Sequence, residues 1–202
     1  MGLKKIAVFI SGGGSNLQAL IDHIHQKYGE IALVLSSDSK AYGMTRAKEN
    51  NITAISLNTK EANYEETVIA ICKENKIDFI VLAGYLKIIS PQIVSTYADK
   101  IINIHPSLIP SFCGAEYYGL RVHEKAIEYG VKVSGATVHF IDIGTDTGPI
   151  IMQKTVCVEY EDTPITLQKK IIEVEHEILV SSVQKMCEEK LILTGRKVRV
   201  LA

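Results

Sequence analysis

The chain has 202 residues, 47% of them hydrophobic, which suits a single domain (1–202) with a substantial core. Its 22 Lys and Arg residues against 23 Asp and Glu residues leave a net charge of -1 without a run of like charge, so we expect no nucleic-acid partner. No segment approaches transmembrane length, and the N-terminus runs directly into a short apolar strand. We therefore expect a cytoplasmic protein with no membrane partner.

Short β-branched runs alternate with longer amphipathic stretches through the first half of the chain. This pattern predicts strands at 5–10, 31–36, 53–57, 79–82 and 101–105. It predicts helices at 15–28, 42–50, 64–75 and 91–97. Because right-handed crossovers turn such an alternation into a parallel sheet, we expect an α/β fold with a mainly parallel, doubly wound sheet and helices on both faces.

The second half of the chain has a different order of predicted helices and strands. A helix is predicted at 122–129, followed by long strands at 131–141 and 149–158. The connection between these strands is short, which favours an antiparallel pair at the edge of the sheet near the C-terminus. A long amphipathic helix is predicted at 166–190.

The four cysteines are scattered without a Cys-x-x-Cys pair, so the sequence indicates neither a zinc site nor a redox motif. We expect reduced thiols and no metal.

Asn103 and His105 stand near the end of the fifth predicted strand. Alternation along a strand puts both side chains on one face, with Ile102 and Ile104 on the other. Pro106 cannot extend the hydrogen-bond ladder, so His105 is expected where the sheet gives way to a loop, and active sites gather at such strand ends. The alternative is a half-buried histidine whose hydrogen bonds an asparagine neighbour satisfies.

The loop after the first predicted strand is rich in glycine. Three glycines let a backbone approach a ligand closely, and the N–H groups at the following helix start attract an anion. We therefore expect a phosphate at Gly12, Gly13, Gly14, Ser15 and Asn16. The spacing matches neither the dinucleotide fingerprint nor a P-loop, and a purely structural glycine turn is the alternative.

Asp146 lies in a glycine-flanked loop, 142–149, between the two late strands. Such an edge loop can fold over the strand that carries His105, and a carboxylate there favours the charged imidazolium. The alternative is a solvated turn aspartate.

Five segments occur in an order that resembles the phosphoribosylglycinamide formyltransferase family, at 12–17, 82–85, 103–110, 135–140 and 146–150. The resemblance implies transfer of a formyl group from 10-formyltetrahydrofolate, as co-substrate, to the amine of glycinamide ribonucleotide in de novo purine synthesis. It also implies that the protein binds small-molecule substrates, needs no metal, and is a monomer or a homodimer.

By this resemblance the catalytic residues are Asn103, His105 and Asp146. Asn103 and His105 flank the formyl group, and Asp146 tunes the histidine. An amide N–H donor beside an imidazolium stabilises the oxyanion that forms on the formyl oxygen. His105 would then help to protonate the departing folate nitrogen, directly or through water.

The resemblance also implies binding residues. The ribonucleotide phosphate lies on the loop from Gly12 to Asn16, and Glu175 contacts the ribose, although Glu175 also reads as an exposed helix residue. The pterin side of the folate inserts between the loop 141–146 and a segment whose apolar members also read as ordinary core, and Asn103 also contacts the folate. That segment comprises Leu86, Lys87, Ile88 and Ile89.

Three features depart from the family pattern. The loop at 111–120 is several residues longer than usual and contains two tyrosines. Lys87 replaces a common arginine, and an arginine for the folate tail has no clear counterpart, although Lys60 is close.

Two further histidines stand near the site, of which His139 is expected to be structural and His123 solvated.

Three other functions fit part of the sequence pattern. A formyltetrahydrofolate hydrolase has water as acceptor and normally carries an additional N-terminal regulatory domain, whereas this sequence starts at its first predicted strand. A catalytically silent nucleotide-binding module would keep the glycine loop but has no reason to keep Asn103, His105 and Asp146 together. A methionyl-tRNA formyltransferase needs an RNA-binding domain and a basic surface, and the sequence predicts neither.

Overall fold

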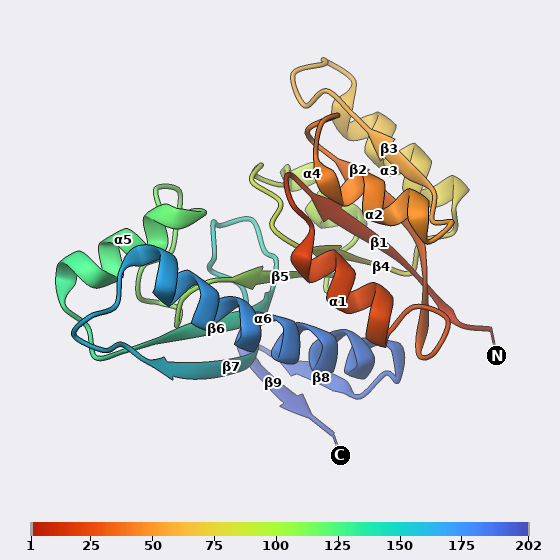
Figure 1. Ribbon diagram of the computed structural model, residues 1–202. Helices are drawn as coiled ribbons and strands as arrows, with labels where there is room; N and C mark the ends of the chain where they lie inside the picture. Colours follow the sequence, from red (N-terminus) through yellow and green to blue (C-terminus); the bar gives the residue numbers. More distant parts are fainter. Residues whose placement is uncertain (1, 202) are drawn as a thin grey trace.

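The computed structural model describes residues 2–201. Among them, seven strands form one sheet in the order β3-β2-β1-β4-β5-β6-β7 (Figure 1). The parallel strands are β1 (Lys4–Ile10), β2 (Gly29–Ser36), β3 (Ala54–Ser56), β4 (Phe79–Leu82) and β5 (Ile101–His105). The antiparallel strands at one edge are β6 (Val133–Phe140) and β7 (Ile150–Cys157). The expected fold class is confirmed.

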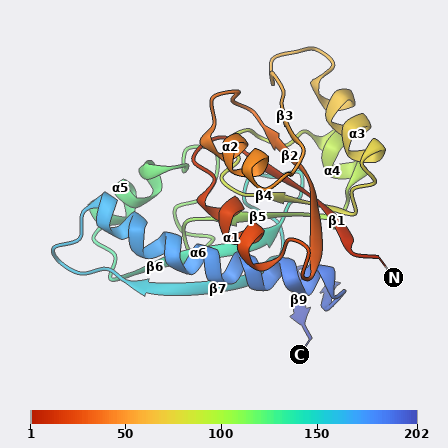
Figure 2. The same cartoon turned by 45° about the vertical axis from the view of Figure 1, so that its right-hand side comes forward.

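Helices cover both faces of the sheet (Figures 1 and 2). One face is packed by α1 (Ser15–His23), α2 (Tyr42–Glu49), α5 (Leu120–Tyr129) and α6 (Pro164–Cys187). The other face is packed by α3 (Tyr64–Glu74) and α4 (Pro91–Thr96).

Alternation along the central strands divides the core into two clusters. In β1, Ile6 and Val8 belong to the cluster under α1 and α6, whereas Ala7 and Phe9 belong to the cluster under α3. All four side chains are fully buried. A strand buried on both faces reads as a continuous apolar run, which is why β1 and β4 were recognisable in the sequence.

Two parts of the fold differ from the sequence prediction. Helix α1 ends at His23 and not at residue 28, because Gln26 takes a left-handed backbone conformation with φ of 60° in the turn that leads to β2. The buried Ile24 continues the apolar period past the true helix end. A C-terminal hairpin of β8 (Leu191–Thr194) and β9 (Lys197–Val200) was not predicted.

The order of the strands locates the site. The chain order reverses between β1 and β4, and ligands in open α/β sheets bind beyond the carboxyl ends of strands at such a reversal. The two strand ends are tied together there, because the Ser11 N–H donates to the Gly84 carbonyl at 3.1 Å and Ser11 Oγ accepts from the Leu86 N–H at 2.9 Å.

Gly148 closes the loop that carries Asp146 against the end of β6. A Cβ added at Gly148 would lie 1.8 Å from the Phe140 carbonyl oxygen, so the backbone would have to move. We expect Gly148→Ala to lower the free energy of unfolding by about 3 kcal/mol, measured by urea denaturation. Gly12→Ala is the matched control, because nothing lies within 4 Å of its added Cβ, and an equal loss in both variants would contradict the packing argument.

Candidate active site

A cleft of about 320 Å³ opens where α1, α6 and the loops after β4, β5 and β6 meet. It brings together residues that are far apart in the sequence and that were predicted to form a site. These are Ser15, Asn16, Leu86, Lys87, Ile88, Ile89, Asn103, His105, Asp146 and Glu175.

Four predicted residues do not line this cleft. Gly12, Gly13 and Gly14 form the loop before α1, and Gly14 caps the helix with a left-handed φ of 71°. Lys60 lies in the turn before α3, where its backbone N–H donates to Asn58 Oδ1.

The pairing of β5 with β6 sets the face on which the polar residues lie. Asn103 stands opposite His139, and His105 stands opposite Thr137. Ile102 and Ile104 point to the opposite face and join the core under α6, as predicted.

His139 fixes the orientation of the Asn103 amide. Its Nδ1 lies 2.8 Å from the Phe140 carbonyl oxygen, which can only accept, so Nδ1 carries the proton. Burial lowers the pKa of His139, which keeps the ring neutral and leaves Nε2 bare. The Asn103 Nδ2 therefore donates to Nε2 at 3.1 Å. His139 was expected to be structural; it is fully buried, and it also contacts this predicted site residue directly.

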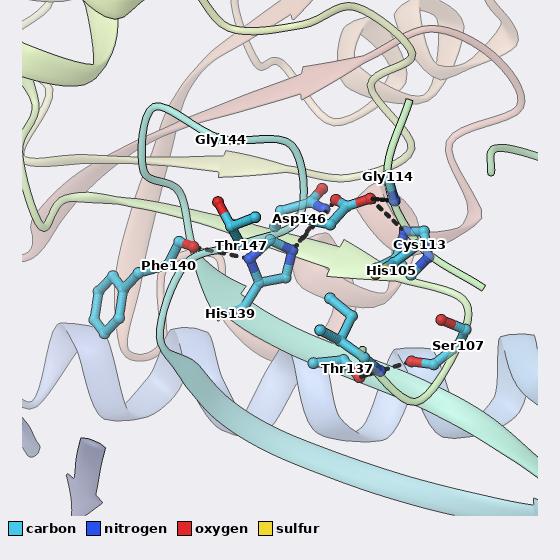
Figure 3. A network of polar contacts seen from close by, with 12 residues as sticks. His105, Ser107, Cys113, Gly114, Thr137, His139, Phe140, Gly144, Asp146 and Thr147 are labelled. Carbon is cyan, nitrogen blue, oxygen red and sulfur yellow. Dashed lines mark hydrogen bonds and ion pairs between the residues drawn. The ribbon is translucent and has the colours of Figure 1, made fainter. Parts of the chain in front are cut away.

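His105 and Asp146 meet as predicted (Figure 3). The His105 Nδ1 lies 3.6 Å from the Asp146 Oδ2, and the exposed fractions of the two side chains are only 6% and 11%. The His105 Nε2 donates to the Phe112 carbonyl at 2.9 Å. Asp146 Oδ2 also accepts the Gly114 N–H at 2.8 Å, and Asp146 Oδ1 lies 3.7 Å from the His139 Nε2, so three groups surround the carboxylate.

A second layer of hydrogen bonds holds the loop that follows β5. The Thr137 hydroxyl donates to the Ser107 carbonyl at 2.6 Å and accepts the Ile109 N–H at 3.1 Å. The Ser107 hydroxyl donates to the Ser111 carbonyl at 2.6 Å. These bonds tie the turn after His105 to β6, so the imidazole sits on a fixed backbone.

Asn16 and Glu175 form a buried polar pair at the other end of the cleft. Asn16 Nδ2 donates to Glu175 Oε2 at 3.0 Å. Burial raises the pKa of the Glu175 carboxyl to about 7, and the Asn16 hydrogen bond opposes this rise. Asn16 Oδ1 is buried and has no hydrogen-bond partner among residues 2–201.

His123 was expected to be solvated, and this expectation is wrong. The residue is 2% exposed and lines the cleft, because α5 packs against α6 and turns this side chain inward. Burial, followed by the charge of His105, lowers the pKa of His123 to about 4. Its Nδ1 has no hydrogen-bond partner in the described part of the chain. Val122 and Ala126 mark the apolar face of α5, and their spacing does not indicate that the histidine between them is buried as well.

The described residues contain no group of three or more His, Cys, Asp or Glu side chains arranged to hold a metal ion. None of the helices within 2–201 combines the length and the hydrophobicity needed to cross a membrane.

Taken together, the fold and the cleft have the form of an α/β enzyme site with an amide, an imidazole and a carboxylate at one strand end. Residues 4–183 match the family described as formyl transferase. The chain therefore belongs to the formyl transferase family.

Individual relatives show which members of this family the chain is similar to. Phosphoribosylglycinamide formyltransferase of Haemophilus influenzae is 41% identical over 182 residues, which cover 87% of this chain and 84% of the relative. The chloroplastic phosphoribosylglycinamide formyltransferase of Vigna unguiculata is 36% identical over 197 residues, which cover 94% of this chain. The match spans 62% of that relative's length.

Solved structures agree with the fold. Glycinamide ribonucleotide transformylase 1 from Symbiobacterium toebii is similar with a TM-score of 0.92 and 34% identity, covering 99% of this chain and 95% of the other. A formyltetrahydrofolate deformylase from Pseudomonas syringae has a TM-score of 0.89 but 26% identity, covering 100% of this chain and 67% of the other.

The raised pKa of Glu175 predicts a dependence of stability on pH. Between about pH 4.5 and 7 the folded protein binds a proton that the unfolded chain releases, so this residue's contribution to stability falls as the pH rises. The fall amounts to about 3 kcal/mol. We expect Glu175→Gln, which cannot ionise, to be more stable than the wild type at about pH 8 by up to that amount, measured by urea denaturation.

The control for this measurement is Glu173→Gln, an exposed position on the same helix. It should leave the pH dependence of unfolding unchanged. An unfolding free energy for Glu175→Gln that tracks the wild type across the whole range would contradict the assignment of a buried, protonated carboxyl.

Proposed function

We propose that this chain transfers the formyl group of 10-formyltetrahydrofolate to the amine of glycinamide ribonucleotide, as in de novo purine synthesis. The convergence of Asn103, His105 and Asp146 on one cleft carries the proposal. Membership of the formyl transferase family and the names of the relatives support it.

The chemistry requires that a negative charge be stabilised. The amine lone pair forms the new C–N bond, and the π electrons of the formyl group move to its oxygen. Asn103 uses one amide N–H on His139 and keeps a second for this oxygen. His105 supplies positive charge in its doubly protonated form, and Asp146 offsets that charge.

Collapse of the intermediate restores the formyl C=O bond and breaks the bond to the folate nitrogen. That nitrogen keeps the electron pair and gains one proton, while the amine loses one. The reaction therefore needs no net proton, and a His105–Asp146 pair has only to hold charge in place during the transfer. Two protein groups anchor the imidazole from opposite sides, so its orientation is set before substrates bind.

The ribonucleotide is assigned to the α1 end of the cleft. Backbone N–H groups at the start of α1, from Gly12 to Ser15, suit a phosphate. The Asn16 Oδ1 suits a sugar hydroxyl donor. The Glu175 carboxyl, whose pKa burial raises to about 7, can accept from the second hydroxyl and, when protonated, donate to it.

The folate is assigned to the opposite wall. Leu86 and Ile88 line the cleft although they are 56% and 76% exposed, so they offer an apolar surface to a flat ring. Lys87 lies between them on the same wall. Contact of the folate tail with Lys60 stays a prediction, since Lys60 lies outside the cleft. The cytoplasmic location and the monomer or homodimer also stay predictions.

An assay with and without the acceptor separates the candidate functions. We expect release of tetrahydrofolate from 10-formyltetrahydrofolate only when glycinamide ribonucleotide is present. Turnover that ignores the ribonucleotide would favour a hydrolase, a reaction for which the deformylase of similar fold provides the precedent. No turnover under either condition would favour a silent binding module.

The proposed roles predict large losses in rate. We expect His105→Ala and Asp146→Asn each to lower kcat by about 10²–10³-fold, because each removes part of the charge stabilisation. We choose Asn as the replacement for Asp146 because Asp146 has a left-handed φ of 58°, and Asn tolerates this backbone conformation.

The same substitution at a remote aspartate provides the control. Asp99 is exposed and has a φ of 57°, so Asp99→Asn makes an equal chemical change in an equal backbone conformation. It should leave kcat unchanged. Near-normal turnover of either site variant, with the fold intact by circular dichroism, would contradict the role assigned to that residue.

A further inference from the structure

One short backbone segment supplies partners to both members of the His105–Asp146 pair. The Phe112 carbonyl accepts the His105 Nε2–H at 2.9 Å, and the Gly114 N–H donates to Asp146 Oδ2 at 2.8 Å. The segment 112–114 therefore fixes the imidazole on one side and the carboxylate on the other. A small rotation of this backbone would disturb both contacts together.

The backbone of this segment is in an unfavourable conformation. Phe112 has a φ of 49°, in the left-handed region that aromatic residues rarely adopt. Such a conformation persists only where the surroundings hold it, and it is concentrated at functional sites. In this conformation the Phe112 carbonyl accepts the His105 Nε2–H, so a contact that holds the Phe112 backbone also holds the imidazole.

Two tyrosine rings lie beside the Phe112 side chain. The Tyr117 ring lies edge-on to Phe112 with centroids 6.1 Å apart and planes at 67°. The Tyr129 ring, at the end of α5, lies 6.0 Å away with planes at 76°. Both arrangements are the favourable T-shaped geometry of aromatic pairs. Phe112 itself packs against the core cluster under α6.

We propose that Tyr117 and Tyr129 are positioning residues for the reaction, forming an aromatic clamp on Phe112 that keeps its carbonyl on His105 and the Gly114 N–H on Asp146. The clamp acts on the catalytic pair through the backbone, without a bond from either tyrosine to His105. Tyr117 comes from the loop at 111–120 that follows β5. The clamp thus gives that loop a role in orienting the imidazole.

The two tyrosines differ in a way that separates positioning from substrate contact. Tyr117 lines the cleft and can touch a ligand, whereas Tyr129 is 82% exposed and is not part of the cleft lining. If the clamp positions His105, Tyr129→Ala should affect turnover even though this residue lies outside the cleft. If Tyr117 only binds substrate, Tyr129→Ala should leave the rate of turnover unchanged.

The test compares Tyr117→Ala and Tyr129→Ala with the corresponding Phe variants, which keep the rings. We expect each Ala variant to lower kcat by about threefold to tenfold with KM unchanged, and each Phe variant to restore it. Tyr160→Ala, at a 92% exposed tyrosine before α6, should behave as the wild type. Thermal melting of every variant checks that the fold is intact.

A second readout does not need the proposed activity. Nitrogen-15 NMR of histidine-labelled free protein should show the His105 Nε2–H as hydrogen-bonded and slowly exchanging in the wild type and the Phe variants. It should exchange faster in both Ala variants. The clamp rests on the proposed function only for the predicted change in kcat. If the protein shows no formyl transfer but the Ala variants change the His105 NMR signal, the proposed function is overturned and the clamp is not.

Three results would overturn the clamp. One is an unchanged His105 signal in both Ala variants. Another is a kcat for Tyr129→Ala equal to that of the wild type. The third is a Tyr117→Ala variant whose defect lies entirely in KM, which would make Tyr117 a substrate contact.

Discussion

The antiparallel register between β5 and β6 places an amide, two imidazoles and a threonine hydroxyl on one face of the sheet. A slip of β5 by one residue would turn Asn103 and His105 to the other face, where α6 packs. The apolar residues that alternate with the polar ones favour this register, since Ile102 and Ile104 are buried in the core cluster on the α6 side. Core packing on one face therefore determines the chemistry on the other.

Polar groups at the site are buried before any ligand arrives, and several are incompletely paired. Asn16 Oδ1 and His123 Nδ1 lack partners within residues 2–201, and Glu175 holds its proton at an unusually high pH. Buried polar groups favour any partner that completes their hydrogen bonds. A ligand that binds these groups in the folded state stabilises that state, which couples substrate binding to stability.

Much of the fold was predictable because buried strands and amphipathic helices leave periodic patterns. The shared face of Asn103 and His105 followed from alternation alone, and the approach of Asp146 followed from the short connection between β6 and β7. The contact between Asn103 and His139 could not be predicted, because it depends on a cross-strand register that local sequence does not encode. The burial of His123 depends on how α5 docks, which is equally non-local.

The central claim is that His105 and Asp146 act as one unit, and a double-mutant cycle tests it most directly. The quantity to measure is kcat/KM for glycinamide ribonucleotide in the wild type, His105→Ala, Asp146→Asn and the combined variant. If the carboxylate acts through the imidazole, the combined variant should be about as slow as His105→Ala alone. Losses that multiply in the combined variant would contradict the claim, because they would mean that the two side chains act independently.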